Sequence, residues 1–394
     1  MKTNKIMGIY IHIPFCIKKC NYCDFLSFTA DDLSKEAYIN ALINKIKYYG
    51  EKYNDYHIST VFIGGGTPSV LIPGAINRIM TALHTFFQME ECSEITIECN
   101  PGTVTDEKLS EYINSGINRI SFGLQSTNNN ELKYLGRIHT YDLFLDSYEL
   151  ARKAGFKNIN IDLMSALPYQ TIDSYCSTLN DVLSLRPEHI SAYSLIIEEG
   201  TPFSNISASL LPDEDTEREM YHLTKTILKN AGYDRYEISN YSLKGYECNH
   251  NISYWKRINY LGIGLGSSSL LRKDYCYTNT AILKNVRFTE TKDMNKFINS
   301  KGNTISDSSV LSLKEIIEEY IFLGLRLTAG ISADDFYQTF KINLYDLYSK
   351  EIDYLKNLNV ITFSNNILKF TDYGFDISNT ALTYFLDPNI EFFL

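Results

Sequence analysis

Two hydrophobic periods alternate along the first 240 residues of the chain. Short runs rich in β-branched and aromatic residues, such as "MGIYIHI" and "ISTVFI", are typical of buried strands. Longer stretches with apolar residues three or four positions apart are typical of amphipathic helices. The predicted strands are 7–13, 58–63, 94–99, 118–122, 157–163 and 188–195. The predicted helices are 32–49, 69–88, 105–115, 141–154, 171–184 and 213–231.

This alternation predicts an α/β fold built from βαβ units around a parallel sheet. Glycines in "NSG" at 114–116 and "KAG" at 153–155 fit the ends of helices. Six repeats of this size favour a partial (β/α)6 TIM-like barrel over a small flavodoxin-like sheet. In such barrels the functional groups lie at the carboxyl ends of the strands, so the residues that follow each strand become the candidates.

The pattern changes twice beyond the sixth strand. An irregular stretch of loops and strands is followed by a tail whose helices are predicted at 311–327, 332–341, 344–357 and 373–385. "NVITFSNNILKFT" within the tail predicts a hairpin with an Asn-rich turn, as in an α+β winged-helix-like domain. The predicted division of the chain is a barrel core at 1–235, an extension at 236–304 and a C-terminal domain at 305–394.

Composition narrows the class of protein. The 394 residues are 44% hydrophobic and 21% charged, which is typical of a soluble globular chain. The formal net charge of −10 and a tail without a basic recognition helix disfavour a nucleic-acid partner. Neither a secretory signal nor an uninterrupted apolar run of membrane-spanning length is visible, so we expect a cytoplasmic protein.

Three cysteines cluster directly after the first predicted strand. Cys16, Cys20 and Cys23 have the spacing C-x3-C-x2-C. Adjacent thiolates repel one another unless a cation compensates them, which favours a metal centre. Structural zinc and iron–sulfur cubes normally take four protein ligands, so three cysteines favour a cube with one open iron. A Cys3His zinc site completed by His12 and a site without metal remain as alternatives.

The second strand is followed by "GGGTPS" at 64–69. Consecutive glycines let a ligand approach the backbone closely and reach its N–H and C=O groups. The segment is neither a Walker loop nor a dinucleotide fingerprint. A tight turn without a ligand is the alternative interpretation.

Polar residues follow or end the next strands. They are Glu98, Gln125, Arg137 and Asp162. A carboxylate can bind ribose hydroxyls or an ammonium group, and a guanidinium can bind a carboxylate through two hydrogen bonds. A ligand with amino, carboxylate and ribose groups would satisfy all four, although each could instead have a structural role.

The combined motifs resemble the radical S-adenosylmethionine (SAM) enzymes. The cysteine spacing, with the aromatic Tyr22 before the last cysteine, carries this resemblance. The wider set "YIHIPFC", "GGGTP", "ECNP", "SFGLQS", "LGRIH", "IDLM" and "YEISNYS" resembles the branch of oxygen-independent coproporphyrinogen III dehydrogenase (oxidase). The resemblance extends over nearly the whole chain.

This resemblance implies a 4Fe–4S cluster on the three clustered cysteines, with the amino and carboxylate groups of SAM on the fourth iron. It also implies an electron donor for the cluster. The residues that it assigns to SAM are Tyr10, Tyr22, Gly65, Gly66, Thr67, Glu98, Gln125, Arg137, Asp162 and Ile196.

Two features of this chain differ from the dehydrogenases and indicate another subgroup of the branch. The dehydrogenases have a further cysteine where this chain has Phe25, and "CNHNISYW" at 248–255 resembles the HN-x-x-YW signature of a haem chaperone subgroup. The resemblance implies haem binding by His250, with Cys248 as a second candidate ligand. A hydrogen-bonded structural histidine is the alternative for His250.

The expected function is therefore haem binding and delivery to apo-haemoproteins. SAM cleavage remains open, and the alternative function is coproporphyrinogen III dehydrogenase. The expected partners are haem, an electron donor and acceptor haemoproteins. Membrane haemoproteins could be among the acceptors, through transient contact. The chain is expected to be a monomer or a homodimer. Tyr169 in "LPYQT" and the segment 265–268 depart from the related sequences, which leaves the shape of these two loops open.

Overall fold

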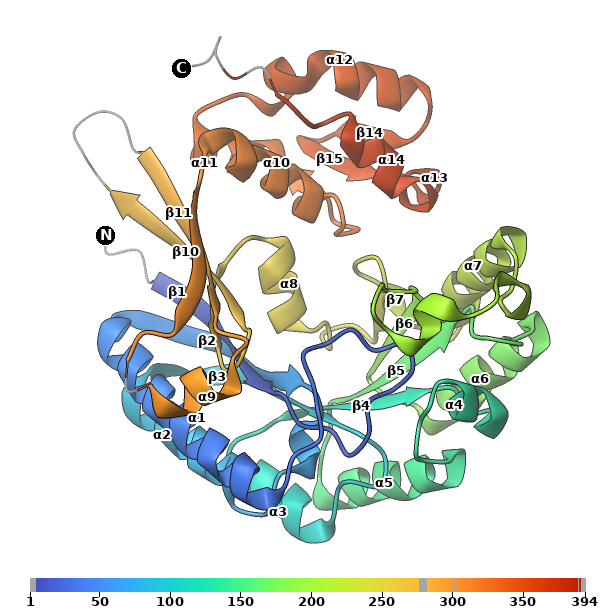
Figure 1. Cartoon of the computed structure of the whole chain (residues 1–394). Helices are drawn as coiled ribbons and strands as arrows, with labels where there is room; N and C mark the ends of the chain where they lie inside the picture. Colours follow the sequence, from blue (N-terminus) through green and yellow to red (C-terminus); the bar gives the residue numbers. More distant parts are fainter. Residues whose placement is uncertain (1–4, 276–281, 301, 389, 391–394) are drawn as a thin grey trace.

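The computed structural model describes residues 5–275, 282–300, 302–388 and 390 (Figure 1). Twelve strands form one sheet in the order β12-β11-β10-β9-β1-β2-β3-β4-β5-β6-β8-β7. The first six strands are β1 (Lys5–Ile13), β2 (Tyr56–Gly65), β3 (Gln88–Cys99), β4 (Arg119–Gln125), β5 (Ile159–Ser165) and β6 (His189–Ser194). The other six are β7 (Asp234–Arg235), β8 (Asn240–Ser242), β9 (Asn259–Ile263), β10 (Ser268–Tyr275), β11 (Ile282–Glu290) and β12 (Ile305–Leu311).

Strands β1 to β6 are parallel neighbours in chain order, which confirms the partial barrel. The helices that follow these six strands cover the outer face of the curved sheet (Figure 1). These helices are α1 (Asp32–Lys52), α2 (Ala75–Phe86), α3 (Asp106–Asn114), α4 (Asn129–Tyr134), α5 (Tyr141–Ala154), α6 (Ile172–Leu185) and α7 (Glu214–Asn230). Strand β9 adds to β1 in parallel, and β10 to β12 continue the sheet as antiparallel strands.

The predicted helix at 69–88 is wrong at its start. Residues Pro68–Val70 form a short 3-10 turn, and α2 begins only at Ala75. Gly74 before it has φ +87°, a left-handed conformation that cannot continue a helix from the preceding residues. Strand β3 begins six residues earlier than predicted, and the six-residue helix α4 escaped prediction because it is too short to show a period.

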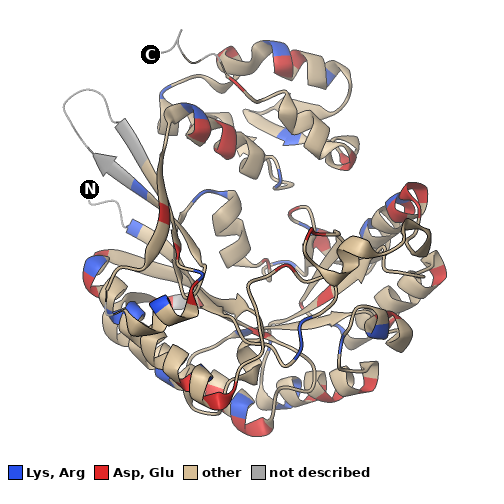
Figure 2. Cartoon of the chain, in the orientation of Figure 1, with Lys and Arg blue, Asp and Glu red and all other residues tan. Residues whose placement is uncertain are grey.

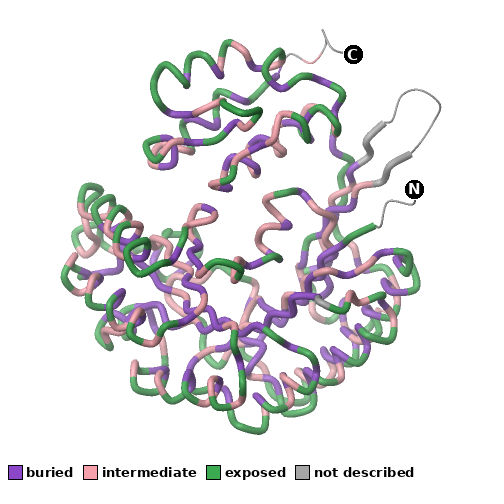
Figure 3. The backbone as a smooth tube through the Cα atoms, turned by 180° about the vertical axis from the view of Figure 1, so that it is seen from behind, coloured by how far each residue is buried: buried purple, intermediate pink, exposed green. Residues whose placement is uncertain are grey.

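Alternation along the barrel strands separates a core face from a lumen face. Ile9, Ile11 and Ile13 of β1 are fully buried in the hydrophobic core, whereas Tyr10 and His12 between them line a cavity. Successive strand residues point to opposite faces, so the polar residues of "IYIHI" must face away from the helices. Buried positions follow the strands of the sheet along the barrel (Figure 3).

The C-terminal part has its own hydrophobic cluster, which extends to Leu270 of β10. Its helices are α10 (Leu313–Gly324), α11 (Ala333–Phe340), α12 (Leu344–Asn357), α13 (Asp372–Asp376) and α14 (Ser378–Thr383). Its small sheet comprises β13 (Ile331–Ser332), β14 (Ile361–Ser364) and β15 (Ile367–Phe370). The strands β14 and β15 form the expected hairpin, whereas the single helix predicted at 373–385 is divided into α13 and α14.

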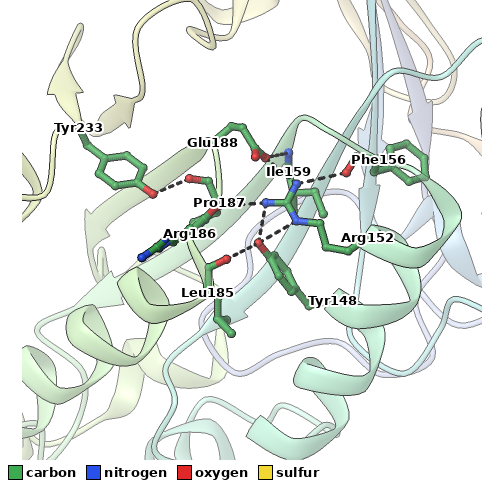
Figure 4. Close-up of polar contacts among 9 residues, drawn as sticks. All are labelled: Tyr148, Arg152, Phe156, Ile159, Leu185, Arg186, Pro187, Glu188 and Tyr233. Atoms are coloured by element: carbon green, nitrogen blue, oxygen red, sulfur yellow. Dashed lines mark hydrogen bonds and ion pairs between the residues drawn. The ribbon is translucent and has the colours of Figure 1, made fainter.

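Charged residues of both signs are mixed along the outer helices (Figure 2). One partly buried cluster ties α5 to the residues just before β6. Arg152 donates hydrogen bonds to the Glu188 carboxylate, the Tyr148 hydroxyl and the carbonyls of Phe156 and Arg186 (Figure 4). In the described residues, no helix is long and apolar enough to cross a membrane.

Candidate functional site

A cavity of about 780 Å³ occupies the barrel lumen. Its volume is within the range of small-molecule and cofactor sites. Among the sequence-predicted residues, the wall contains Tyr10, Cys16, Cys20, Tyr22, Cys23, Gly65, Gly66, Thr67, Glu98, Gln125, Arg137, Asp162 and His250. The helix α8 (Asn249–Trp255) and the short segment after β9 close another part of the wall. The fold therefore gathers residues that are up to 282 positions apart, from Tyr10 to Lys292, around one space.

The cysteine loop is held by backbone bonds to distant segments. Cys16 N–H donates to the carbonyl of Phe28 (3.0 Å), and Asn21 N–H donates to the carbonyl of Leu135 (2.9 Å). The Asn21 carbonyl in turn accepts from Phe203 N–H at 3.0 Å. These contacts hold the loop over the strand ends, so its three thiols reach the cavity without a regular element to support them.

Polar groups surround the thiols. Cys16 Sγ lies 3.4 Å from the Thr67 hydroxyl oxygen, and Arg137 Nη1 lies 3.5 Å from Cys20 Sγ. Burial raises the pKa of the Cys23 thiol, and the neighbouring thiols raise it further. A compensating cation is therefore needed before all three cysteines can be thiolates, which is the condition of a metal centre.

The zinc alternative fits the geometry poorly. Both ring nitrogens of His12 are engaged, Nδ1 with the Tyr10 hydroxyl (3.0 Å) and Nε2 with the carbonyl of Leu26 (2.9 Å). In the part of the chain that the structure describes, no three His, Cys, Asp or Glu side chains converge on a position for one metal ion. In a 4Fe–4S cube each cysteine binds a different iron, so convergence on one point is not required. The donor set of three cysteines beside a large cavity fits a cube.

The glycine segment lies beside the cysteine loop. Gly66 N–H donates to the carbonyl of Ile13 and Thr67 N–H to the carbonyl of Phe15, both at 2.8 Å. Gly65 has φ +112°, and a Cβ atom there would lie 2.4 Å from the His12 ring. Glycine is therefore required at this position both for its backbone conformation and for its close approach to the cavity wall.

Two partly buried carboxylates lie in the wall. Glu98 accepts a hydrogen bond from Gly65 N–H at 3.0 Å, and burial together with the charge of Asp162 raises its pKa to about 7. Burial also raises the pKa of Asp162, which is opposed by hydrogen bonds from Asn160 (2.7 Å) and Ser121 (3.3 Å). A cationic group of a ligand beside these two acids would favour their charged forms.

Arg137 and Gln125 are fixed by neighbours that the sequence did not identify. Arg137 Nη2 donates to Asn100 Oδ1 at 2.8 Å and to the carbonyl of Gly123. Gln125 Oε1 accepts from the Tyr193 hydroxyl at 3.0 Å. The sequence could have identified Tyr193 and Asn100 as candidates, because both lie at or just after the end of a strand.

Ile196 is not brought into the wall. It lies in the loop after β6 and its side chain is 68% exposed. Phe25, in contrast, reaches the wall although it is 63% exposed. Of the two loops whose shape the sequence left open, the first has Tyr169 exposed, with its ring 4.8 Å from that of Tyr134. The 265–268 segment contributes Gly266, Ser267 and Ser268 to the wall.

The two candidate haem ligands both lie at the start of α8. His250 lies in the wall, with Nδ1 2.9 Å from the Thr60 hydroxyl oxygen and Nε2 3.0 Å from that of Tyr254. Burial and the nearby charge of Arg119 lower the pKa of His250 to about 3, so the imidazole is neutral. Cys248 is fully buried outside the wall, with its thiol 3.5 Å from Glu94 Oε1 and its pKa raised by burial to about 12. Only His250 is placed to meet a ligand.

The comparisons with known proteins agree with this geometry. Residues 10–182 match the radical SAM superfamily, and residues 311–377 match the HemN C-terminal domain. The protein named "Heme chaperone HemW" of Lactococcus lactis is 38% identical over 97% of this chain and 98% of its own length. Its namesake in Bacillus subtilis is 34% identical over 96% and 98%. The solved structure of coproporphyrinogen III oxidase (HemN) from Escherichia coli superimposes with a TM-score of 0.82 over 97% of this chain and 90% of its own. At 21% identity, this match shows the fold alone.

Proposed function

The chain belongs to the heme chaperone HemW family within the radical SAM superfamily, and we propose that it binds haem in the barrel cavity and passes it to apo-haemoproteins. The proposal is supported by nearly full-length similarity to proteins of that name. The observation that carries it is the position of His250 in the cavity wall. The same proposal includes an electron donor and acceptor haemoproteins, with transient contact where the acceptor is a membrane protein. The chain would act as a monomer or a homodimer.

His250 would be the protein ligand of haem iron. Iron requires a neutral imidazole, and burial keeps His250 in that form. Thr60 would hold the ring by accepting a hydrogen bond from Nδ1–H, which leaves Nε2 as the donor atom. Tyr254 must release Nε2 when the iron approaches, because its hydroxyl contacts that nitrogen in the present arrangement.

Cys16, Cys20 and Cys23 would hold the 4Fe–4S cluster that the radical SAM family implies, beside bound SAM. The cluster and SAM, when bound, supply one-electron chemistry. The backbone of Gly65 to Thr67 and the side chains of Glu98, Gln125, Arg137 and Asp162 would hold SAM, with Tyr10 and Tyr22 beside it.

Haem titration of the purified protein, followed by visible absorbance, tests the haem proposal. We expect stoichiometric binding, a large loss of affinity in His250→Ala and no loss in His84→Ala, which removes an exposed histidine on α2. Transfer of the bound haem to an added apo-haemoprotein should follow. Binding that is unchanged in His250→Ala would remove this residue from the proposal.

The alternative function, coproporphyrinogen III dehydrogenase, is tested in parallel. The protein with its cluster reconstituted is incubated anaerobically with dithionite, SAM and coproporphyrinogen III. We expect no protoporphyrinogen, and its clear formation would contradict the chaperone function. Cleavage of SAM in the same incubation would show separately whether radical chemistry is retained.

A further inference from the structure

Arg119 is a buried guanidinium whose side chain has no hydrogen-bond partner in the part of the chain that the structure describes. It begins β4, is 2% exposed and lines the cavity. In the described residues it donates no hydrogen bond and forms no close ion pair, and its Nε is without a partner. A buried cation without a direct partner is costly, because its surroundings replace its hydration only in part.

Two other arginines, which are only partly buried, have several hydrogen-bond partners. Arg152 donates to one carboxylate, one hydroxyl and two carbonyls (Figure 4). Arg137 also leaves its Nε unpaired, but its terminal nitrogens donate to Cys20, Asn100 and Gly123. A structural role is therefore visible for these two residues and is missing for Arg119.

Two acids that attract Arg119 bind other groups. Glu94 accepts the N–H groups of Asn249 and His250 at 2.9 and 3.0 Å, and thereby holds the start of α8. Asp162 accepts hydrogen bonds from Asn160 and Ser121. Both acids attract Arg119 through space, which explains how the cation is tolerated, but neither binds its N–H groups.

The surroundings of Arg119 are polar and open to the cavity. Ser121, Asn160, Ser191 and Asn240 line the same space, and the buried Oδ1 of Asn240 is also without a partner. Arg119 starts β4 and Gln125 ends it, a separation of about 20 Å at about 3.3 Å per residue. Arg119 therefore lies at the opposite end of β4 from Gln125, and its charge acts on His250.

We propose that Arg119 binds a carboxylate of the cargo, which in haem is a propionate group. Guanidinium and carboxylate form two parallel charge-assisted hydrogen bonds, and the exchange of an unpaired buried cation for this pair favours the loaded state. The inference rests on the proposed haem binding and adds which part of the ligand is recognised.

The test compares haem with its dimethyl ester, in which both propionates are uncharged, on the full-length protein with its cluster reconstituted. The wild type should bind haem about 10-fold or more tightly than the ester. Arg119→Met should bind both with similar affinity. It loses no hydrogen bond and only the through-space attraction to nearby acids, so its ligand-free form should melt closer to the wild-type temperature than Arg152→Met does.

Arg152→Met is the matched control. It should lower the melting temperature and keep the preference for haem over the ester, because its partners are structural. The inference is overturned if the wild type binds haem and the ester equally, if Arg119→Met keeps the preference, or if Arg119→Met melts as early as Arg152→Met. A wild type that binds neither compound would instead overturn the proposed haem function itself.

Discussion

The hydroxyl oxygen of Thr60 lies 2.9 Å from Nδ1 of His250. The contact joins the lumen face of β2 to α8, although the two residues are 190 positions apart. The His250 ring also stacks on Phe62, with ring centroids 5.2 Å apart. The orientation of the proposed haem ligand is therefore set by the barrel and not by its own helix alone.

Thr60→Val should weaken haem binding about 10-fold, because partners that orient a metal ligand typically contribute that much to affinity. The loss should be smaller than in His250→Ala and is measured by haem titration. Thr96→Val on β3 is the control, since the buried Thr96 hydroxyl has no hydrogen-bond partner. Equal haem affinities of the two valine variants would show that Thr60 does not orient the ligand.

Replacement of Cys16, Cys20 and Cys23 by alanine should abolish the binding of iron and sulfide after anaerobic reconstitution, because these are the only cysteines in the described wall besides Cys99. Cys176→Ala, on α6, is the control and should retain the cluster. Metal analysis is the measurement. Retention of iron by the triple variant, or stoichiometric zinc in the wild type, would contradict the assignment.

Glu98→Gln should make the ligand-free protein more stable above neutral pH. The pKa of Glu98 is raised from 4.5 to about 7, so its contribution to stability is fully present below 4.5 and is lost as pH rises through 7. The neutral amide can still accept the Gly65 N–H. Urea unfolding at about pH 8 should favour the variant by about 1–3 kcal/mol, with little difference at about pH 4.5.

The exposed Glu149→Gln on α5 is the control for this pH dependence and should follow the wild type throughout. If wild-type and Glu98→Gln stabilities keep a constant difference across this range, Glu98 does not titrate as described.

Glu319→Gln should destabilise the protein by about 3 kcal/mol. Glu319 on α10 binds Arg257 and Arg287, both at 2.8 Å, and Arg257 is buried directly after α8. Loss of the carboxylate leaves a buried cation without its partner. Hydrogen exchange should speed up in α8, where His250 lies, and unchanged exchange there would show that α10 does not support this helix.

Much of the site could be predicted from the chain alone. The alternation of Ile9, Tyr10, Ile11 and His12 fixes which face of β1 meets the helices, because the strand period is two. Parallel strands bring their carboxyl ends to one edge, so motifs after successive strands had to meet. The cysteine spacing needed no tertiary information to indicate a metal centre.

The tertiary structure decided what local patterns leave open. Cys248 and His250 are two residues apart, yet the start of α8 turns them to different sides, since each helical residue rotates by about 100°. Ile196 lies outside the wall, in a loop where its side chain is exposed. Arg119 reads as an ordinary strand residue in the sequence. Only packing shows that it is buried without a hydrogen-bond partner, because partners come from distant segments.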